Sequence, residues 1–580
     1  MTQARHLLNS EISLKKADRQ QYLFKSVPKR TELLKLKSEW LGQEITIRIH
    51  RNHSFESVAS AIDPFLEFAG YRASFSYSDY DDSLSFIGCE DLVVLIEVIW
   101  LDYDRYFSND GNDLDFFISW LTARIGALRK ISKAPILIND WPGVGKNDRV
   151  AQAYNQRLVD LCKDLPGVRI CSQRDILGEL GDKFFDARSA KLTGTTWSDR
   201  ACILNARQLA VQWFPASLSP RLKAIVVDLD LTLYEGVLGE DGIAGVELTS
   251  AHLQLQQELL RLKESGILLA IASRNQQQDV EELFQRRPDF PLKLADFAAI
   301  QVNWQAKAEN ITKIADSLRI GIDAILFIDD NPGEIAQVSE QLPTIWTLLA
   351  AHQLPTVHIL KFYPRLWAWE KTTVDNLRLA DLQAAVVRDS LVTTAQNVED
   401  YWQALQVELD FHIDPTAQLV RLCELSQKTN QFNLTLARLN EVELSDYLSR
   451  QNCIVASVHL RDRLSDSGTI GLIIGERVER SLVVREICIS CRALGRDLED
   501  IMIGYALNQM IDSFATSTVV FKYQKAPRND PALKWLEQFT KVSVGGDEIE
   551  ISLNNRDMPN LNPAYLSALK IHTYPQSRSQ

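Results

Sequence analysis

Short apolar runs alternate with helical stripes through the middle of the chain. The runs at 224–227, 267–272 and 324–328 are continuously apolar, which is typical of strands buried on both faces of a parallel sheet. Between the first two runs, leucines at helical spacing in 253–266 predict an amphipathic helix that ends at Gly266. The order strand, helix, strand predicts an α/β domain with a parallel sheet.

The same alternation occurs nearer the N-terminus, after a polar, helix-prone segment. Strands and helices of another parallel α/β domain are predicted at 45–50, 91–101, 113–130, 134–140, 147–164 and 168–171. The proline- and serine-rich segment 214–220 predicts a linker to the middle domain.

The last third predicts an α+β domain. Its elements are three strands, a helix and a further strand, expected at 453–460, 469–475, 482–490, 498–514 and 518–523. The sequence thus predicts three α/β-class domains with flanking segments: 1–44 helical, 45–213 first domain, 214–220 linker, 221–350 middle domain, 351–400 helical connector, 401–554 third domain and 555–580 flexible tail.

Charge and hydropathy restrict the partners. A net charge of −13 over 580 residues argues against nucleic acid or an anionic membrane as the main partner, because both require a basic face. The longest apolar run, 92–101, is broken by Glu97, so no membrane span is expected. The N-terminus lacks the apolar core of a signal peptide, which predicts a cytoplasmic protein. Cys488 and Cys491 form one C-x-x-C without a second pair, so we expect no zinc site there.

Candidate chemistry follows the strands of the middle domain. Polar residues stand at the strands' C-terminal ends or in the loops after them: Asp228, Asp230, Ser273, Lys307, Asp329 and Asp330. A parallel sheet collects these ends on one edge. The set offers a carboxylate nucleophile, a second carboxylate for acid/base work, donors for an oxyanion and ligands for a hard cation. The sequence therefore predicts phosphoryl transfer with Mg²⁺.

These motifs carry a family resemblance. D-x-D-x-T, Ser, Lys and D-D in this order resemble motifs I to IV of the haloacid dehalogenase (HAD) superfamily. The surrounding GVLGEDG, NWQAKAENI and FIDDNPGE resemble its FkbH-like branch, the glyceryl-acyl carrier protein synthases and related subfamily IIIC phosphatases. The resemblance implies that Asp228 attacks phosphorus and that Asp230 protonates the leaving group. It further implies Mg²⁺ held by Asp228, the Asp230 carbonyl and Asp329, with Asp330 nearby.

The same resemblance implies which residues bind substrate. Ser273 and Lys307 would hold the phosphoryl oxygens, and Thr232, Arg274 and Asn303 would complete the substrate-binding set. Strands and crossover helices fill the intervals between the motifs, so we expect a HAD Rossmann-like sheet without a cap domain. An uncapped site favours a tethered substrate, such as the phosphopantetheine arm of an acyl carrier protein.

Three departures from the branch affect the expected activity. Leu231 replaces a common asparagine, Tyr234 and Glu235 replace a usual Trp-Gly, and Ala272 replaces a common cysteine. No cysteine lies between Cys202 and Cys423, so a glyceryl thioester cannot form at that position. The leading expectation is transfer of a glyceryl-type unit from 1,3-bisphosphoglycerate, a small phosphorylated metabolite, to an acyl carrier protein in polyketide or polysaccharide biosynthesis. The alternatives are a phosphatase without acyl transfer and a non-catalytic carrier-binding scaffold.

The flanking domains resemble two enzyme folds in degenerate form. The first is similar to an SGNH-hydrolase-like domain, with Ser54 near a strand end, but no histidine occurs between His53 and His252 to serve a triad. We expect it to be non-catalytic. The third resembles a GNAT-type N-acetyltransferase, whose phosphate-binding loop aligns with Arg492 to Asp497. Asp497 would repel a phosphate there, so we expect a degenerate acyltransferase that grips a pantetheine arm by Arg492, Arg496 and Asn529.

Overall fold

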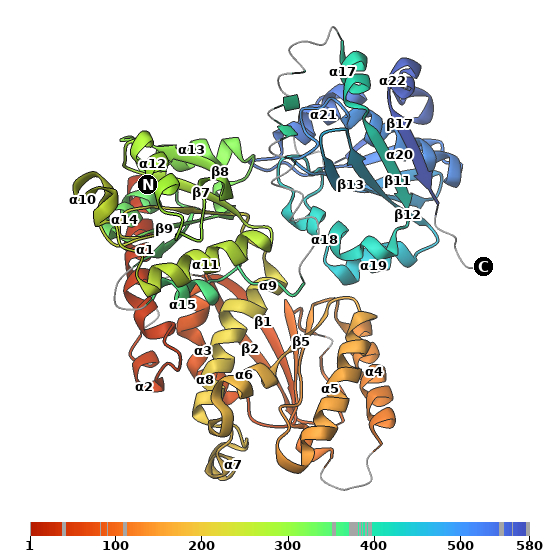
Figure 1. The fold of residues 1–580 in the computed structure, drawn as a ribbon. Helices are drawn as coiled ribbons and strands as arrows, with labels where there is room; N and C mark the ends of the chain where they lie inside the picture. The colour runs from red at the N-terminus through yellow and green to blue at the C-terminus, as the bar shows by residue number, and fades with distance from the viewer. Residues whose placement is uncertain are drawn as a thin grey trace. The chain divides into compact units, whose positions relative to one another are not determined.

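The computed structural model describes residues 2–36, 42–81, 83–89, 91–107, 113–350, 355–370, 381, 384–385, 387–388, 391, 397–544, 550–559 and 561–575. The chain divides into two compact units, Met1–Glu370 and Lys371–Gln580. The first unit contains two five-stranded sheets, and the second contains one seven-stranded sheet (Figure 1). The predicted fold class, α/β in three sheet-containing domains, is confirmed.

The first sheet is wholly parallel, with strand order β2-β1-β3-β4-β5. Its strands are β1 (Gln43–Arg51), β2 (Tyr71–Tyr80), β3 (Ile96–Trp100), β4 (Ile136–Asn139) and β5 (Val168–Cys171). The associated helices are α3 (Glu56–Phe68), α4 (Leu114–Ile131), α5 (Asp148–Lys163), α6 (Gln173–Leu180), α7 (Ala187–Thr193) and α8 (Asp199–Gln208). The edge strand β2 was not predicted, because serines and charged residues break its apolar pattern and most of its residues are partly exposed.

The second sheet is also wholly parallel, with strand order β10-β9-β6-β7-β8. Its strands are β6 (Ala224–Val227), β7 (Leu268–Ser273), β8 (Phe297–Val302), β9 (Ile325–Asp329) and β10 (Trp346–Leu349). Its helices are α10 (Leu238–Gly245), α11 (Ser250–Glu264), α12 (Gln277–Arg286), α13 (Lys307–Ser317) and α14 (Pro332–Gln341). Residues 221–350 are all described, and no further domain is inserted among these elements. The open edge of this sheet therefore lacks a cap.

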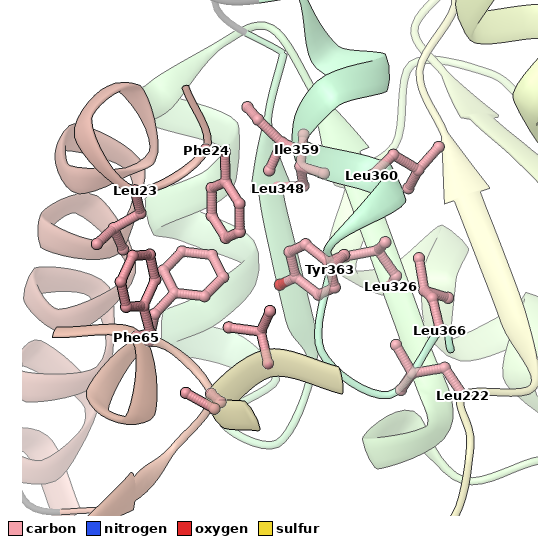
Figure 2. Packing of buried hydrophobic residues seen from close by; sticks show 14 of the residues in the cluster. Leu23, Phe24, Phe65, Leu222, Leu326, Leu348, Ile359, Leu360, Tyr363 and Leu366 are labelled. Atoms are coloured by element: carbon pink, nitrogen blue, oxygen red, sulfur yellow. The ribbon is translucent and has the colours of Figure 1, made fainter. Parts of the chain in front are cut away.

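One hydrophobic core joins both sheets of the first unit. Leu23 and Phe24, at the end of α1 (Thr2–Leu23), lie near Phe65 of α3 and close to Leu348 of β10 (Figure 2). The Gln20 amide also donates to the Leu349 carbonyl (3.0 Å) and accepts from the Leu349 amide (3.3 Å). The N-terminal helical segment thus covers the edge of the second sheet and packs on a helix of the first. Two short helices, α2 (Arg30–Leu33) and α15 (Thr356–Lys361), complete this unit.

The segment 214–220 is not the linker that its composition predicted. A π-helical turn, Leu209–Trp213, continues α8 directly into α9 (Phe214–Leu218). Phe214 is fully buried, Pro215 lies in the first turn of α9, and Pro220 follows the end of that helix. The segment is therefore mostly helical and packed against the core of the first unit.

The sheet of the second unit is mixed, with strand order β16-β15-β14-β13-β12-β11-β17. Its strands are β11 (Glu408–Ile413), β12 (Cys453–Arg461), β13 (Asp466–Val478), β14 (Ser481–Ile489), β15 (Thr518–Lys522), β16 (Glu550–Asn554) and β17 (Lys570–Tyr574). Its helices are α17 (Val398–Leu405), α18 (Leu419–Lys428), α19 (Glu441–Ser449), α20 (Glu499–Phe514), α21 (Asp530–Thr540) and α22 (Pro563–Ala568). The strands and the helix predicted for this region agree with β12 to β15 and α20.

Within the predicted flexible tail, 555–580, the described residues 555–559 and 561–575 include regular structure. The tail contains α22 and then β17, which pairs in parallel with β11. Lys570–Tyr574 alternates like a strand but is too short and polar to be recognised without its partner. Most of the predicted connector between 371 and 396 lies outside the described residues. Within the described part of the chain, no helix is both long and apolar enough to cross a membrane.

Candidate active site

Four strand ends of the second sheet bring the candidate residues to one edge. Asp228 follows the central strand β6, Ser273 ends β7, and Asp329 ends β9. Lys307 begins α13, in the connection that follows β8. Because β6 lies between β9 and β7, Asp228 is flanked on both sides by strands that end in polar groups.

A buried lysine joins two of the carboxylates. Lys307 Nζ lies 2.8 Å from Asp228 Oδ2 and 2.5 Å from Asp329 Oδ2, and all three residues are at least nine-tenths buried. Burial alone would lower the pKa of Lys307, but the two carboxylates outweigh it and raise that pKa. Burial raises the pKa of Asp329, and the nearby ammonium of Lys307 only partly offsets this rise. The lysine is therefore held charged between two acids.

The same carboxylates have capacity for a cation. Asp228 Oδ1 is buried and has no hydrogen-bond partner in the described residues. Carboxylate oxygens of Asp228, Asp329 and Asp330 lie within 4.8 Å of one another. Three carboxylates, one of which has a buried oxygen without a described hydrogen-bond partner, fit a hard divalent cation such as Mg²⁺. This ion binds through few carboxylates and keeps several of its waters. Asp228, Asp329 and Asp330 were all predicted as metal ligands; the fourth predicted ligand, the Asp230 carbonyl, stays a prediction.

Asp230 accepts hydrogen bonds from three donors, none of which was assigned to it from the sequence. The Tyr234 hydroxyl (2.7 Å) and the Leu238 amide (3.1 Å) donate to Asp230 Oδ1. Asn275 Nδ2 donates to Asp230 Oδ2 (2.9 Å) and also lies 3.2 Å from the Ser273 hydroxyl. Burial, and next the Asp230 carboxylate, raise the pKa of Tyr234 far above its ordinary value, so the phenol keeps its proton and donates. Asn275 lies two residues after the predicted Ser273, and no sequence motif identified it as a site residue.

The loop after β6 is strained at one residue. Leu231 has a φ of 56°, in the left-handed region that a branched side chain rarely adopts. Its amide donates to the Gly236 carbonyl (3.3 Å), which closes the turn that carries Asp230. Thr232 is 1% exposed, and its hydroxyl has no partner in the described residues, so it lies beneath the loop with spare capacity.

Two other predicted substrate-binding residues are already engaged. Asn303 exchanges amide hydrogen bonds with Asn310 (3.0 and 3.2 Å) and accepts from the Gln305 amide (2.9 Å). This geometry gives Asn303 a role in shaping the loop and does not support direct substrate binding. The guanidinium of Arg274 pairs with Glu334 of α14 at 3.0 Å and stays 42% exposed, so it can still reach a ligand at the rim.

The residues predicted to grip a pantetheine arm do not gather into an anion site. Arg496 is 4% exposed, and its guanidinium lies 3.1 Å from both Asp381 and Asp462. The fully buried Asn529 donates its amide protons to the carbonyls of Asn433 (3.1 Å) and Gln524 (2.7 Å). Both side chains are therefore used to hold the fold together, which corrects the prediction for them.

Arg492 and Asp497 lie in the loop between β14 and α20. Arg492 is half-buried, and its amide lies 3.4 Å from the Ser490 hydroxyl. Asp497 has a φ of 55°, and Leu498, not Asp497, is the N-cap residue of α20. An exposed carboxylate thus stands immediately before the helix start, where a phosphate would need a neutral residue.

Among the described residues, the corresponding edge of the first sheet has no group of potential metal ligands like the one formed by Asp228, Asp329 and Asp330. The Ser54 hydroxyl donates to Glu56 (2.7 Å), and His53 Nδ1 lies 3.1 Å from the Thr195 hydroxyl. His53 is fully buried, and burial together with the charges of Arg105 and Arg51 lowers its pKa to about 3. The prediction that this domain is non-catalytic stays a prediction. The Ser54 hydroxyl bonds to a carboxylate, and no contact in the described residues joins it to a histidine.

Comparison with known proteins gives remote structural likenesses. No family model matches the chain, and no curated protein sequence does. The crystal structure of the N-terminal part of BF1531 from Bacteroides fragilis, which contains a phosphatase domain complexed with Mg, is 21% identical over 59% of this chain and 96% of that one, with a TM-score of 0.45.

Two acetyltransferase structures are similar to a smaller part of the chain. Spermidine N-acetyltransferase SpeG from Vibrio cholerae is 15% identical over 26% of this chain and 98% of its own, with a TM-score of 0.19. N-acetyltransferase PseH from Campylobacter jejuni is 14% identical over 19% of this chain and 74% of its own, with a TM-score of 0.15. Likenesses this remote transfer no activity to the chain.

Proposed function

We propose that the chain is a Mg²⁺-dependent enzyme of the HAD type that cleaves a phosphate ester or acyl phosphate at the edge of its second sheet. The observation that carries the proposal is the buried set of Asp228, Lys307 and Asp329, in which Asp228 Oδ1 has no hydrogen-bond partner in the described residues. Burying like charges around one lysine is costly, and a ligand that uses the remaining capacity explains why they are kept.

The residues divide the chemistry between them. Asp228 attacks phosphorus, and the bond from phosphorus to the leaving oxygen breaks while Asp230 gives that oxygen a proton. Asp230 then takes a proton from water, whose oxygen displaces Asp228 and releases phosphate. Lys307 and Ser273 bind the phosphoryl oxygens. Mg²⁺, held by Asp228, Asp329 and Asp330, would neutralise charge on the transferring group.

The same site suits a substrate that is presented from outside. Residues 221–350 include no cap, so a group on a flexible arm can approach the sheet edge. This openness favours a second candidate, transfer of a glyceryl-type unit to an acyl carrier protein. Ala272 is fully buried in β7, and residues 203–422 contain no cysteine, so the chain offers no thiol there for a thioester relay. The phosphoryl step is therefore our first proposal.

One experiment separates the candidates. The full chain is incubated with Mg²⁺, holo-carrier protein and 1,3-bisphosphoglycerate, and intact mass and phosphate release are measured together. Phosphate that appears without a carrier adduct supports the phosphatase, and a glyceryl adduct supports transfer. A panel of phosphate esters is run beside it, with Asp228→Asn as the matched variant. If no substrate releases phosphate faster with the wild-type chain than with Asp228→Asn, the enzyme proposal is wrong and a carrier-binding scaffold becomes the better explanation.

A further inference from the structure

A second group of potential metal ligands lies on one face of the sheet in the second unit, whereas the site described above belongs to the first unit. Three adjacent strands build this face: β12, β11 and the edge strand β17 (Figure 1). Asp410 of β11 pairs with His459 of β12 on one side and with His572 of β17 on the other. Directly paired residues point to the same face, so one carboxylate stands between two imidazoles.

The neighbouring row adds a carboxylate and two cations. Glu408 precedes Asp410 by two residues and therefore lies on the same face, paired with Arg461 and Lys570. The opposite face of β11 belongs to the core, because Leu409 and Phe411 are buried and the Phe411 ring lies 4.6 Å from that of Tyr505 in α20. The polar row is thus the outer face of the strand.

Distances and burial point to a cation at the centre of this group. One ligand atom from each of Glu408, Asp410 and His572 lies within 4.8 Å of the other two. Asp410 is only 8% exposed, and its Oδ1 atom is buried with no hydrogen-bond partner in the described residues. His572 Nε2 lies 3.0 Å from Glu408 Oε1, and half of its ring is exposed. A buried carboxylate oxygen without a donor needs a positive partner.

Arg461 supplies part of that positive charge in the structure. Its guanidinium lies 2.6 Å from Glu408 Oε1 but 3.7 Å from Asp410 Oδ2, so it pairs well with one carboxylate only. The Arg461 side chain is 46% exposed and can swing into solvent, after which an ion could take its place beside the Glu408 and Asp410 carboxylates. His459 is paired with Asp466 at 2.8 Å, beside the same row.

We propose that Glu408, Asp410 and His572 bind a divalent transition-metal ion, with Zn²⁺ as the representative, and that Arg461 occupies part of this space when no metal is bound. Mixed imidazole and carboxylate ligands suit Zn²⁺ and its first-row neighbours better than Mg²⁺. Such an ion sits about 2 Å from each ligand, so the exposed His572 ring and the Glu408 side chain need only a small rotation to close on it. The site is independent of the phosphoryl chemistry proposed above.

The test is a Zn²⁺ titration of the full chain by calorimetry after chelator treatment, with Co²⁺ absorption in the visible range as a second readout. Asp410→Asn and His572→Ala should each weaken one binding event by at least about tenfold, since even outer-shell changes have effects of this size. His412→Gln, two residues along the same face, is the matched control and should leave that event unchanged. Asp228→Asn reports on the other carboxylate site and should leave this one intact, so the two proposals fail separately.

Arg461→Gln gives a result of opposite sign that an unfolded variant cannot imitate. Removing the competing guanidinium should tighten Zn²⁺ binding at this site, provided that circular dichroism shows an unchanged fold. If Asp410→Asn and His572→Ala give the wild-type isotherm, or if Arg461→Gln does not tighten binding, the group is a network of ion pairs on a sheet surface and the metal-site proposal is wrong.

Discussion

The two parallel sheets of the first unit have similar C-terminal edges but use their polar side chains differently. After β1, the Ser54 hydroxyl is bonded to Glu56, and the His53 ring is buried against Trp100 and Trp197. After β6, Asp228 and Asp329 share one lysine, and an Asp228 oxygen has no partner in the described residues. At the first edge the Ser54 hydroxyl has a hydrogen-bond partner and the buried His53 ring is neutral. At the second edge the buried groups are charged, and a carboxylate oxygen is left without a hydrogen-bond partner in the part of the chain that the structure describes.

This difference separates polar residues that stabilise a fold from those placed for chemistry. A neutral imidazole packed against indoles contributes through burial, and although its Nε2 atom has no hydrogen-bond partner in the described residues, it carries no charge that a ligand must offset. Two carboxylates around an ammonium in a buried site repel each other, and this arrangement remains costly until a cation joins them. Both edges occupy the same position in their sheets, so position alone does not identify an active site.

The largest expected effect is on phosphate release, and it tests whether the two sheet edges differ in catalysis. Asp228→Asn should lower phosphate release by about 10³-fold or more, because it removes the attacking oxygen. Ser54→Ala, the matched change at the other edge, should leave the rate within about twofold, as expected of a small buried side chain that lies outside the reacting site. The measurement is kcat on the best substrate of the ester panel with saturating Mg²⁺. A large loss in Ser54→Ala would show that the first edge takes part in catalysis.

The next effect concerns the positioning of Asp230. Tyr234→Phe removes the hydroxyl that donates to Asp230 Oδ1 and should lower kcat by about tenfold, since a hydrogen bond to a charged group contributes roughly 1.5 kcal/mol. The loss should be larger for alkyl phosphates than for aryl phosphates, because a poor leaving group needs the proton more. Phe290→Leu is the control, since Phe290 stacks on Tyr234 at 5.9 Å without touching its hydroxyl bond. Equal losses for both leaving groups would contradict the positioning role.

The sequence predicted the buried strands far better than the edge strands. The runs AIVV and ILLAIA became β6 and β7 with almost unchanged bounds, because strands covered on both faces must be apolar throughout. The strands β2 and β17 lie at sheet edges and carry polar residues at alternate positions. Their state is decided by the neighbouring strand, which a local pattern cannot contain.

A similar limit applied to the candidate site. The sequence alone predicted that Asp228, Lys307 and Asp329 lie close together, because the C-terminal ends of parallel strands meet at one edge of the sheet. The engagement of Arg496 and Asn529 could not, because their partners come from distant segments: Asp381 for the first and Asn433 for the second. Because they are engaged by partners distant in the sequence, Arg496 and Asn529 stabilise the fold and do not bind the expected ligand.

A smaller effect tests the neutral, buried state proposed for the first edge. The pKa of His53 is lowered from 6.5 to about 3, so between these pH values the unfolded chain binds a proton at His53 that the folded protein does not bind. The free energy of unfolding should therefore fall as the pH drops below the unfolded pKa, by about 1 kcal/mol between about pH 7 and about pH 5.5 from this group. In His53→Gln that component should disappear. Urea unfolding followed by tryptophan fluorescence at the two pH values measures the difference, and an unchanged pH dependence in the variant would contradict the assignment.

The smallest expected effect is on the free energy of unfolding, and it tests the backbone strain at Leu231 in the loop after β6. Leu231 has a φ of 56°, a conformation that costs a branched residue about 1 to 2 kcal/mol and that asparagine adopts more readily. Leu231→Asn should therefore raise the free energy of unfolding of the first unit by about 0.5 to 1 kcal/mol. Thermal unfolding with and without Mg²⁺ measures this gain, and Leu231→Ala, which keeps a Cβ but gains no local hydrogen bond, is the control. If Leu231→Asn is stabilising and fully active, the strain at this residue is incidental to the chemistry; if Leu231→Asn is no more stable than the wild-type chain, the cost assigned to this conformation is wrong.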